Sequence, residues 1–299
     1  MEYRSVIYEL PRELFDRAAP LFAEAWMDGA FIWGPFEDHL PGRLFVDDAA
    51  RPTAALMYRP FEYYVAGDPG AAQLRRFIAD APAEVTIFER LYGYVATNVP
   101  LAQALLADHA GRLSVVARRC FRWQDDQAAQ AALEQWREPA AGFTIQQIDK
   151  TLAERFDREL GTMMGPFWSG RDNFLAHGFG FCALAGDELG SIAYAAAVGG
   201  GEANIAVVTA PTFRRRGLAA RVCTAFIDYC QGHALVATWD CDANNAASAA
   251  LACSLGFREG VPFAQLSTPG YVKLTESHGR WERGELMAAG IISWRQVGE

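Results

Sequence analysis

The sequence lacks long apolar runs and an excess of basic charge. No stretch of its 299 residues approaches the ~18 uninterrupted apolar residues of a membrane span. Lys and Arg number 27 against 36 Asp and Glu, which gives a formal net charge of -9 at pH 7. Binding to nucleic-acid phosphates generally needs a basic surface, so we expect neither a nucleic-acid nor a membrane partner. A local basic loop would still suffice for a small anionic ligand.

Cysteine and histidine are also scarce, at six and five residues. No two cysteines form a Cys-x-x-Cys pair, and none has zinc-ligand spacing with a histidine. The sequence therefore predicts no metal site and thiols that stay reduced. The first residues, MEYRSVIYELPRELFDR, are charged throughout, unlike the apolar segment of a signal peptide. A cytoplasmic location is the corresponding expectation.

The composition is that of a folded protein, with 51% hydrophobic and 21% charged residues. A chain of this length predicts two domains or one large one. Residues 125–142, DDQAAQAALEQWREPAAG, are polar and rich in Ala and Gln before they reach Pro139 and Gly142. We place a short helix and a linker there. The predicted division is an N-terminal domain over 1–124, a linker over 125–142 and a second domain over 143–299.

Both halves alternate helical and strand patterns, which predicts an α/β or α+β fold with a mixed sheet flanked by helices. In the first half, apolar residues recur at helical spacing from Pro11 to Asp28. The second half predicts the order β-α-β-β-β-α-β-α-β-β, in which a strand over Glu202–Thr209 precedes a helix over Arg216–Gln231. Because the halves share a rough element order, we hypothesise that the first is a degenerate copy of the second, although no sequence repeat supports this.

The segment from Val207 to Ala220, VVTAPTFRRRGLAA, carries the strongest chemical signal. A strand ends at Thr209, and three arginines followed by Gly217 open a helix. A helix start exposes unpaired N–H groups at the positive end of the helix dipole, and small residues let a ligand approach the backbone. A diphosphate suits this geometry, and arginines add charge for its oxygens. The alternative is a solvated basic helix start that binds nothing.

This segment resembles the R/Q-x-x-G-x-G/A signature of the GNAT superfamily, the acetyl-CoA-dependent N-acetyltransferases, through R-x-x-G-x-A at residues 214–219. A second motif, N-x-x-S-x-x-L-A-x-x-L-G-F at residues 245–257, resembles the helix that follows the fifth strand in that family. The predicted element order also agrees, and the resemblance covers about residues 143–276. The sequences GFGFCAL at 178–184 and GRLFVDD at 42–48 resemble a bacterial two-domain subgroup.

The resemblance implies that acetyl-CoA is the co-substrate. In this family the fourth strand splays from the fifth, and the pantetheine arm lies in the wedge like an added strand. The implied cofactor-binding residues are Val207, Val208, Thr209, Arg214, Arg215, Arg216, Gly217, Leu218, Ala219, Ala220, Asn245 and Ser248. For Asn245, helix capping is an equal and compatible interpretation, with Ser248 then merely solvated.

The implied activity is transfer of an acetyl group to a primary amine of a small molecule or peptide, by direct attack on the thioester. Two usual catalytic groups are absent, because the position of the general-acid tyrosine is Ala252 and that of the glutamate base is Asn204. Candidate catalytic residues are therefore Glu202, Asn204 and Asp240. Glu202 would act through a water chain, or it would be a solvated start of a strand. Asp240 would act as a base or hold a cationic acceptor.

The acceptor wall is expected at residues 167–173, FWSGRDN, which makes Trp168 and Arg171 candidate substrate-binding residues. The alternative is a surface loop with a packed tryptophan. The first half would shape the acceptor entrance or form a homodimer contact. Two rival functions stay open: a non-enzymatic acyl-CoA-binding or sensing protein, which the missing acid and base predict, and an interaction module with a decayed cofactor site.

Overall fold

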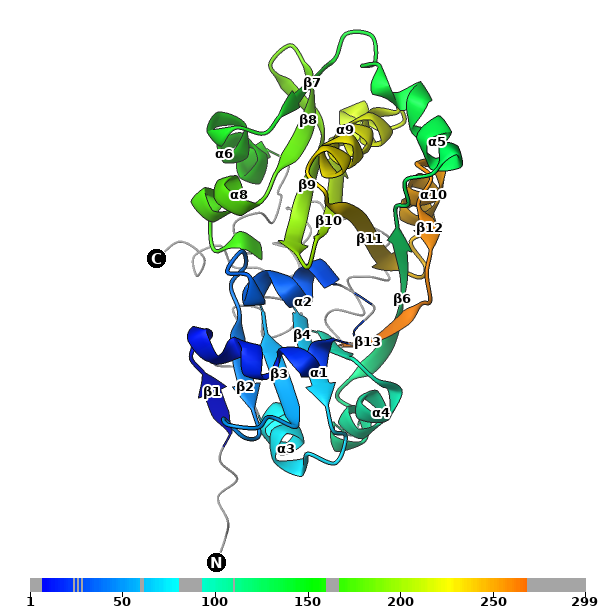
Figure 1. Ribbon diagram of the computed structural model, residues 1–299. Helices are drawn as coiled ribbons and strands as arrows, with labels where there is room; N and C mark the ends of the chain where they lie inside the picture. The colour runs from blue at the N-terminus through cyan, green and yellow to red at the C-terminus, as the bar shows by residue number, and fades with distance from the viewer. Residues whose placement is uncertain are drawn as a thin grey trace, which may run out of the picture. The chain divides into compact units, whose positions relative to one another are not determined.

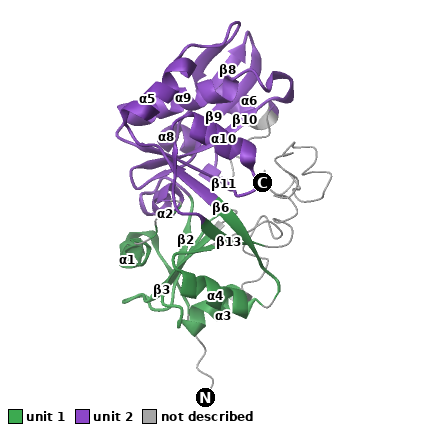
Figure 2. Cartoon of the chain, turned by 90° about the vertical axis from the view of Figure 1, so that its right-hand side faces the viewer, with its two compact units in different colours: residues 1–28, 41–118, 263–299 green, residues 29–40, 119–262 purple. Residues whose placement is uncertain are grey.

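The computed structural model describes residues 7–23, 25, 27, 29–59, 62–80, 93–109, 111–159 and 167–267. The chain divides into two compact units, coloured separately in Figure 2. Unit 1 comprises residues 1–28, 41–118 and 263–299, and unit 2 comprises residues 29–40 and 119–262. Neither unit begins or ends within residues 125–142, where we predict a linker between two domains. The compact units are defined by packing alone, so the predicted division into domains stays a prediction.

Unit 1 is built on a mixed sheet. Its strands are β1 (Tyr8–Leu10), β2 (Arg43–Val46), β3 (Ala54–Tyr58), β4 (Glu62–Gly67), β5 (Gly93–Ala96), β13 (Phe263–Ser267) and the first part of β6 (Ser114–Arg122). Strands β1 to β4 are antiparallel, β4 and β5 are parallel, and β13 lies antiparallel between β5 and β6. Apolar residues of this sheet, such as Leu56 and Val65, form a core with Leu74 of helix α3 (Ala72–Asp80) and Leu105 of α4 (Val99–Asp108).

The helix predicted from Pro11 to Asp28 is interrupted in unit 1. Residues Arg12–Arg17 form a 3-10 helix, η1, and Ala19–Phe22 form a short α-helix, α1. Pro20 stands in the first turn of α1. A proline is tolerated there because that N–H would be unpaired anyway, but its ring blocks the continuation of a preceding helix.

Unit 2 has the same pattern of pairing. Its strands are β7 (Thr144–Gln147), β8 (Gly180–Ala185), β9 (Glu188–Gly199), β10 (Glu202–Thr209), β11 (Val236–Asp242), β12 (Arg258–Glu259) and the end of β6. Strands β7 to β10 are antiparallel, β10 and β11 are parallel, and β12 pairs antiparallel with β6 (Figure 1). Its helices are α2 (Gly29–Phe36), α5 (Gln127–Arg137), α6 (Lys150–Glu159), η3 (Pro211–Phe213), α8 (Arg171–His177), α9 (Leu218–Gly232) and α10 (Ala246–Ser254).

The predicted mixed α/β fold is confirmed. The order predicted for the second half agrees as far as α10, with α8 added, whereas residues 257–266, which we expect from the sequence to form one strand, form two, β12 and β13. The last predicted strand, at 271–276, lies outside the described residues. Helix α9 packs one face into the core of unit 2, because Val222, Phe226 and Cys230 recur on that face and are buried. The Phe226 ring packs 4.5 Å from that of Phe179, the residue before β8.

Segment 125–142 contains the expected short helix, α5. Asp126 caps its start by accepting hydrogen bonds from two backbone N–H groups. The helix packs on α9, since Arg137 pairs with Asp228 at 3.3 Å and the guanidinium of Arg221 lies 5.2 Å from the ring of Trp136. These contacts make α5 part of unit 2.

Candidate functional site

Strands β10 and β11 pair at their beginnings and then continue as separate strands. Their parallel register covers three pairs, from Glu202 with Val236 to Asn204 with Thr238. Against β9, the register of β10 shifts between Asn204 and Ile205, and such a bulge bends a strand and increases its twist. Beyond it, β10 continues to Thr209 and β11 to Asp242. We call residues 205–209 and 239–242 the fork; it closes at Asn204.

The corresponding strands of unit 1 form no such fork within the described residues. All four residues of β5 pair with β4, from Glu62 with Gly93 to Val65 with Ala96. The ladder extends one step further, because the N–H of Thr97 donates to the carbonyl of Val65 at 2.9 Å. Unit 1 therefore keeps its parallel strands together where unit 2 separates them.

The arginine loop, residues 214–217, connects the fork to helix α9. Arg215 and Gly217 both have left-handed backbone conformations, with φ of 65° and 73°. Gly217 is the N-cap of α9, and no side chain caps the helix start. The first N–H groups of a 15-residue helix thus face outward beside three exposed arginines. Backbone donors, helix dipole and cationic side chains together suit a phosphate group.

The packing around Gly217 explains why this position is glycine. A Cβ here would lie 2.6 Å from Nη1 of Arg221 and 2.9 Å from Cζ3 of Trp136. Its positive φ also disfavours any residue with a side chain. Gly217 is therefore required by its backbone conformation and by the close packing of Trp136 from α5. From the sequence alone we expect the glycine to serve the close approach of a ligand.

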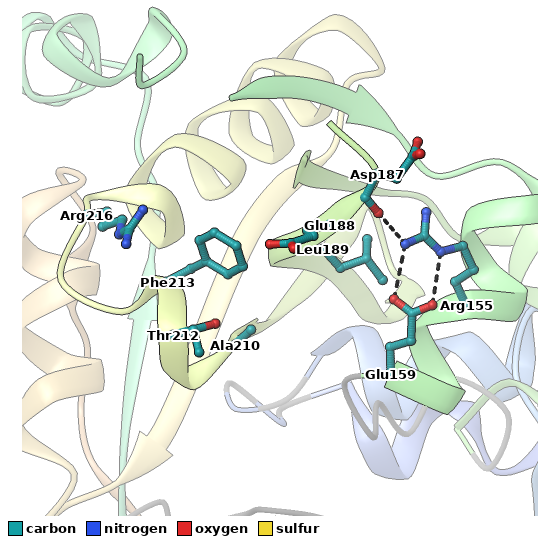
Figure 3. A pocket seen from close by; sticks show the side chains of 9 residues that line it. All are labelled: Arg155, Glu159, Asp187, Glu188, Leu189, Ala210, Thr212, Phe213 and Arg216. Atoms are coloured by element: carbon teal, nitrogen blue, oxygen red, sulfur yellow. Dashed lines mark hydrogen bonds and ion pairs between the residues drawn. The ribbon is translucent and has the colours of Figure 1, made fainter. Parts of the chain in front are cut away.

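A pocket of about 640 Å³ adjoins the arginine loop (Figure 3). It is lined by Arg155, Glu159, Asp187, Glu188, Leu189, Ala210, Thr212, Phe213 and Arg216. On one side, Arg155 is held by Glu159 at 3.1 Å and by the carbonyl of Asp187 at 2.5 Å. On the other, the guanidinium of Arg216 lies 5.3 Å from the ring of Phe213. Arg216 thus belongs both to the loop and to the pocket wall.

Glu202 is held in an ion pair at the base of the fork. Its Oε1 accepts a hydrogen bond from Nη1 of Arg122, and its side chain is only 16% exposed. A Cβ on Gly29, the first residue of α2, would lie 2.6 Å from Oε2. Glu202 is therefore not a solvated strand start. Sequence reasoning missed Arg122 and Gly29, because each is far from Glu202 along the chain.

Asn204 and Asp240 meet where the fork closes. Asn204 is 5% exposed, and its Nδ2 donates to Oδ1 of Asp240 at 3.1 Å. Along β11, Trp239 and Cys241 are buried, whereas Thr238, Asp240 and Asp242 are partly exposed. Because strand side chains alternate between faces, Asp240 lies on the face opposite Trp239. The structure thus brings two of the three predicted catalytic residues into direct contact.

Asn245 and Ser248 already have partners within the chain. Oδ1 of Asn245 accepts a hydrogen bond from the N–H of Ser248 at 3.1 Å, which makes Asn245 the N-cap of α10. Oγ of Ser248 accepts from Nε1 of Trp239 at 2.9 Å. The capping interpretation describes Asn245, while Ser248 links α10 to the buried Trp239 and is not merely solvated. Their predicted contact with a cofactor stays a prediction.

Replacing Asn245 by alanine is expected to lower the free energy of unfolding by about 1 kcal/mol, because α10 loses its cap. The affinity for acetyl-CoA is expected to stay within twofold, since the side chain is already engaged by the helix. Thermal unfolding and calorimetry with acetyl-CoA check the two parts. A stable variant with much weaker binding would instead favour a direct contact with the cofactor.

Trp168 is a core residue, whereas Arg171 is exposed. Trp168 has 0% exposure, and its Nε1 donates to the carbonyl of Ala195 at 2.9 Å. Its ring meets Phe174 edge-on at 5.7 Å. A side chain with no exposed surface does not present itself to a substrate, so the structure agrees with the packed-tryptophan interpretation. Arg171, in the first turn of α8, keeps its predicted role as a candidate acceptor contact.

Cys253, the thiol next to Ala252 in the sequence, does not take the place of the absent tyrosine acid. Ala252 is fully buried in α10, and its neighbour Cys253 is exposed on another face of the helix. Burial raises the pKa of the Cys182 and Cys230 thiols to about 12, and it raises that of Cys223 as well. These three buried thiols are therefore protonated at neutral pH and are poor nucleophiles.

Among the described residues, no group of three or more His, Cys, Asp or Glu side chains is placed to hold a metal ion. No helix in those residues is long and apolar enough to cross a membrane.

Comparison with known proteins places this geometry in a family. A protein of Bacillus subtilis (strain 168), the uncharacterized N-acetyltransferase YdfB, is 24% identical over 255 residues, which are 85% of this chain and 95% of that protein. A GCN5-related N-acetyltransferase-like protein from Streptococcus suis 89/1591 superposes with a TM-score of 0.67 at 22% identity, covering 86% of this chain and 98% of that one. A tandem GNAT protein from the clavulanic acid biosynthesis pathway has a TM-score of 0.59 at 15% identity, covering 88% and 96%.

At these identities the solved structures show the fold, which is that of GNAT proteins. The family model for GNAT acetyltransferases matches residues 19–265 and therefore spans both halves, including the first half that the sequence motifs alone left unassigned. This match extends over most of the chain, and the chain accordingly belongs to the GNAT acetyltransferase family.

Proposed function

We propose that the protein transfers an acetyl group from acetyl-CoA to a primary amine, by direct attack of the amine on the thioester. The observation that carries the proposal is the fork between β10 and β11, continuous with an uncapped helix start beside three arginines. Membership of an acetyltransferase family supports the same reaction. The acetyl donor would lie along the fork, with its diphosphate at the N–H groups that follow Gly217.

The dimensions of the fork suit an extended arm. From Ile205 to Thr209, β10 advances about 13 Å at ~3.3 Å per residue. The amide groups of a pantetheine arm can pair with backbone along such an edge, as an added strand would. With the diphosphate at the arginine loop, the reacting thioester would lie toward the closed end of the fork, near Asn204. The backbone at the register shift, beside Asn204 and Ile205, is the candidate donor for the oxyanion.

We further propose one acetyl-CoA site per chain, in unit 2. In unit 1 the turn after β4 carries Asp68 in place of arginines, and Oδ1 of Asp68 accepts from the N–H of Gly70 at 2.7 Å. The next N–H groups donate to carbonyls of the same turn. A loop with a carboxylate and internally paired donors does not favour phosphate. Because β4 and β5 stay paired over all four residues of β5, the described part of unit 1 has no fork in which a pantetheine arm could lie.

The alanine at position 252 favours a second candidate function, the binding of acyl-CoA without catalysis. Position 252 is a buried alanine, so the described part of α10 supplies no tyrosine acid for the leaving thiolate. A non-enzymatic acyl-CoA-binding protein would need the fork and the arginine loop but no proton-transfer group. Such a protein would bind acetyl-CoA without turning it over.

An amine screen separates the two functions. The full-length protein is mixed with acetyl-CoA and with spermidine, tyramine, lysine amide or hydroxylamine, and the release of CoA thiol is followed. Acetyl transfer predicts thiol release that depends on the amine and a matching acetylated product by mass spectrometry. Binding of acetyl-CoA with no release above the protein-free rate for any amine would support the binding protein.

A further inference from the structure

We infer that Asp240 takes the proton from a cationic amine acceptor, that Asn204 positions Asp240, and that Glu202 serves as a structural clamp. This inference rests on the proposed function and assigns roles within the same site. It is carried by the contacts of the three side chains at the closed end of the fork.

The acceptor enters the reaction as an ammonium ion. An alkylamine with a pKa near 10.4 is protonated at pH 7, and freeing its lone pair costs ~4–5 kcal/mol. A carboxylate beside the thioester can hold the ammonium ion and then accept its proton. The site therefore needs a carboxylate that lies at the closed end of the fork and is partly open to an incoming ligand.

Asp240 meets both requirements. It stands two residues beyond Thr238, where the pairing of β11 with β10 ends, and it is partly exposed. Its contact with Asn204 at 3.1 Å places its carboxylate at the closing point of the fork. Any thioester that lies along β10 with its diphosphate at the arginine loop ends close to this carboxylate.

Asn204 fixes the orientation of that carboxylate. An amide nitrogen can only donate and a carboxylate oxygen can only accept, so the polarity of this hydrogen bond is set. Asn204 is almost completely buried, and its backbone lies between β9 and β11. It cannot itself accept a proton at neutral pH, which makes it a positioning residue.

Glu202 forms an ion pair through one carboxylate oxygen, and the other oxygen lies close to the start of α2. Arg122 donates to Oε1, and Oε2 faces Gly29 at the start of α2. Helix α2 is further attached to the turn between β9 and β10, because Oε1 of Glu37 accepts from the N–H of Gly200 at 2.8 Å. Glu202 and Glu37 thus hold α2 on this turn, beneath the closed end of the fork.

The ammonium ion gives one proton to the carboxylate of Asp240, and the freed nitrogen pair forms a bond to the thioester carbon. The C–S bond then breaks, and the electron pair leaves on sulfur. The second nitrogen proton neutralises the thiolate, and the first returns from Asp240 to solvent. The products are the amide, CoA thiol and one proton.

The test compares a cationic with a neutral nucleophile. Hydroxylamine is uncharged at pH 7 and needs no base, whereas spermidine, tyramine and lysine amide are cations. In Asp240→Asn we expect transfer to the alkylamine that the wild type uses to fall at least about a hundredfold, with transfer to hydroxylamine within threefold. Acetyl-CoA affinity by calorimetry is expected to be unchanged. Asn204→Ala should lower the same alkylamine-to-hydroxylamine ratio about tenfold.

Glu202→Gln is the comparator. It should lower the unfolding temperature, because the pair with Arg122 is lost, and leave the alkylamine-to-hydroxylamine ratio as in the wild type. Equal loss of both nucleophiles in Asp240→Asn, or no loss of either, would overturn the assignment of the base. A wild-type protein that acetylates hydroxylamine but none of the alkylamines would overturn the cationic acceptor. A wild type that binds acetyl-CoA but transfers to no nucleophile would refute the proposed function, and this inference with it.

Discussion

Replacing Ala219 by glutamate is expected to weaken acetyl-CoA binding a hundredfold or more. Ala219 is the second residue of α9, beside the N–H groups that we assign to the diphosphate. Two unit charges about 4 Å apart near a protein surface repel each other by ~4 kcal/mol, which is ample for this loss. A carboxylate in the first turn of a helix favours the helix itself, so the fold should persist. Calorimetry with acetyl-CoA measures the change.

The matched control is Ala219→Gln, which has the same size and no charge. It should lose no more than about tenfold in affinity. If glutamate and glutamine weaken binding equally, the effect is steric and the diphosphate does not lie at this helix start. Gly217→Glu is a poorer test, since the positive φ and the contacts with Arg221 and Trp136 would disturb the loop with any side chain.

Replacing Trp168 by alanine is expected to lower the free energy of unfolding by about 3–5 kcal/mol. The side chain is fully buried, meets Phe174 edge-on and donates to the carbonyl of Ala195. In a unit of this size, the loss corresponds to an unfolding temperature lower by roughly 10 °C. Thermal unfolding followed by circular dichroism measures it.

Trp168→Phe distinguishes packing from the hydrogen bond. It keeps an aromatic ring but leaves the carbonyl of Ala195 without this donor, so we expect an intermediate loss. A Trp168→Ala protein with wild-type stability and a raised KM for the amine would show that Trp168 contacts the acceptor, contrary to its burial.

The features that follow from local sequence could be predicted. The strand over Glu202–Thr209 has the predicted bounds, because a short, mainly apolar run lies between a glycine turn and Pro211. The arginine loop and the start of α9 were identified from a short motif whose chemistry depends on neighbouring residues. Capping of α10 by Asn245 is likewise a contact between residues three apart.

The features that depend on distant residues could not be predicted. Arg122 lies 80 residues from Glu202, and Gly29 comes from the other half of the sequence. No periodicity reveals such partners, so Glu202 resembled a base or a solvated residue. The burial of Trp168 depends on Ala195 in β9, and the sequence alone left it open. Strand β13 follows unit 2 in the chain but completes the sheet of unit 1, which no local pattern indicates.

The measurement that tests the central claim most directly is a calorimetric titration of the full-length protein with acetyl-CoA, with free CoA alongside. We predict micromolar affinity, about -8 kcal/mol, with one molecule bound per chain. Two molecules per chain would contradict the assignment of the site to unit 2 alone. No detectable heat, together with no competition between the two ligands, would contradict the fork and arginine loop as an acetyl-CoA site.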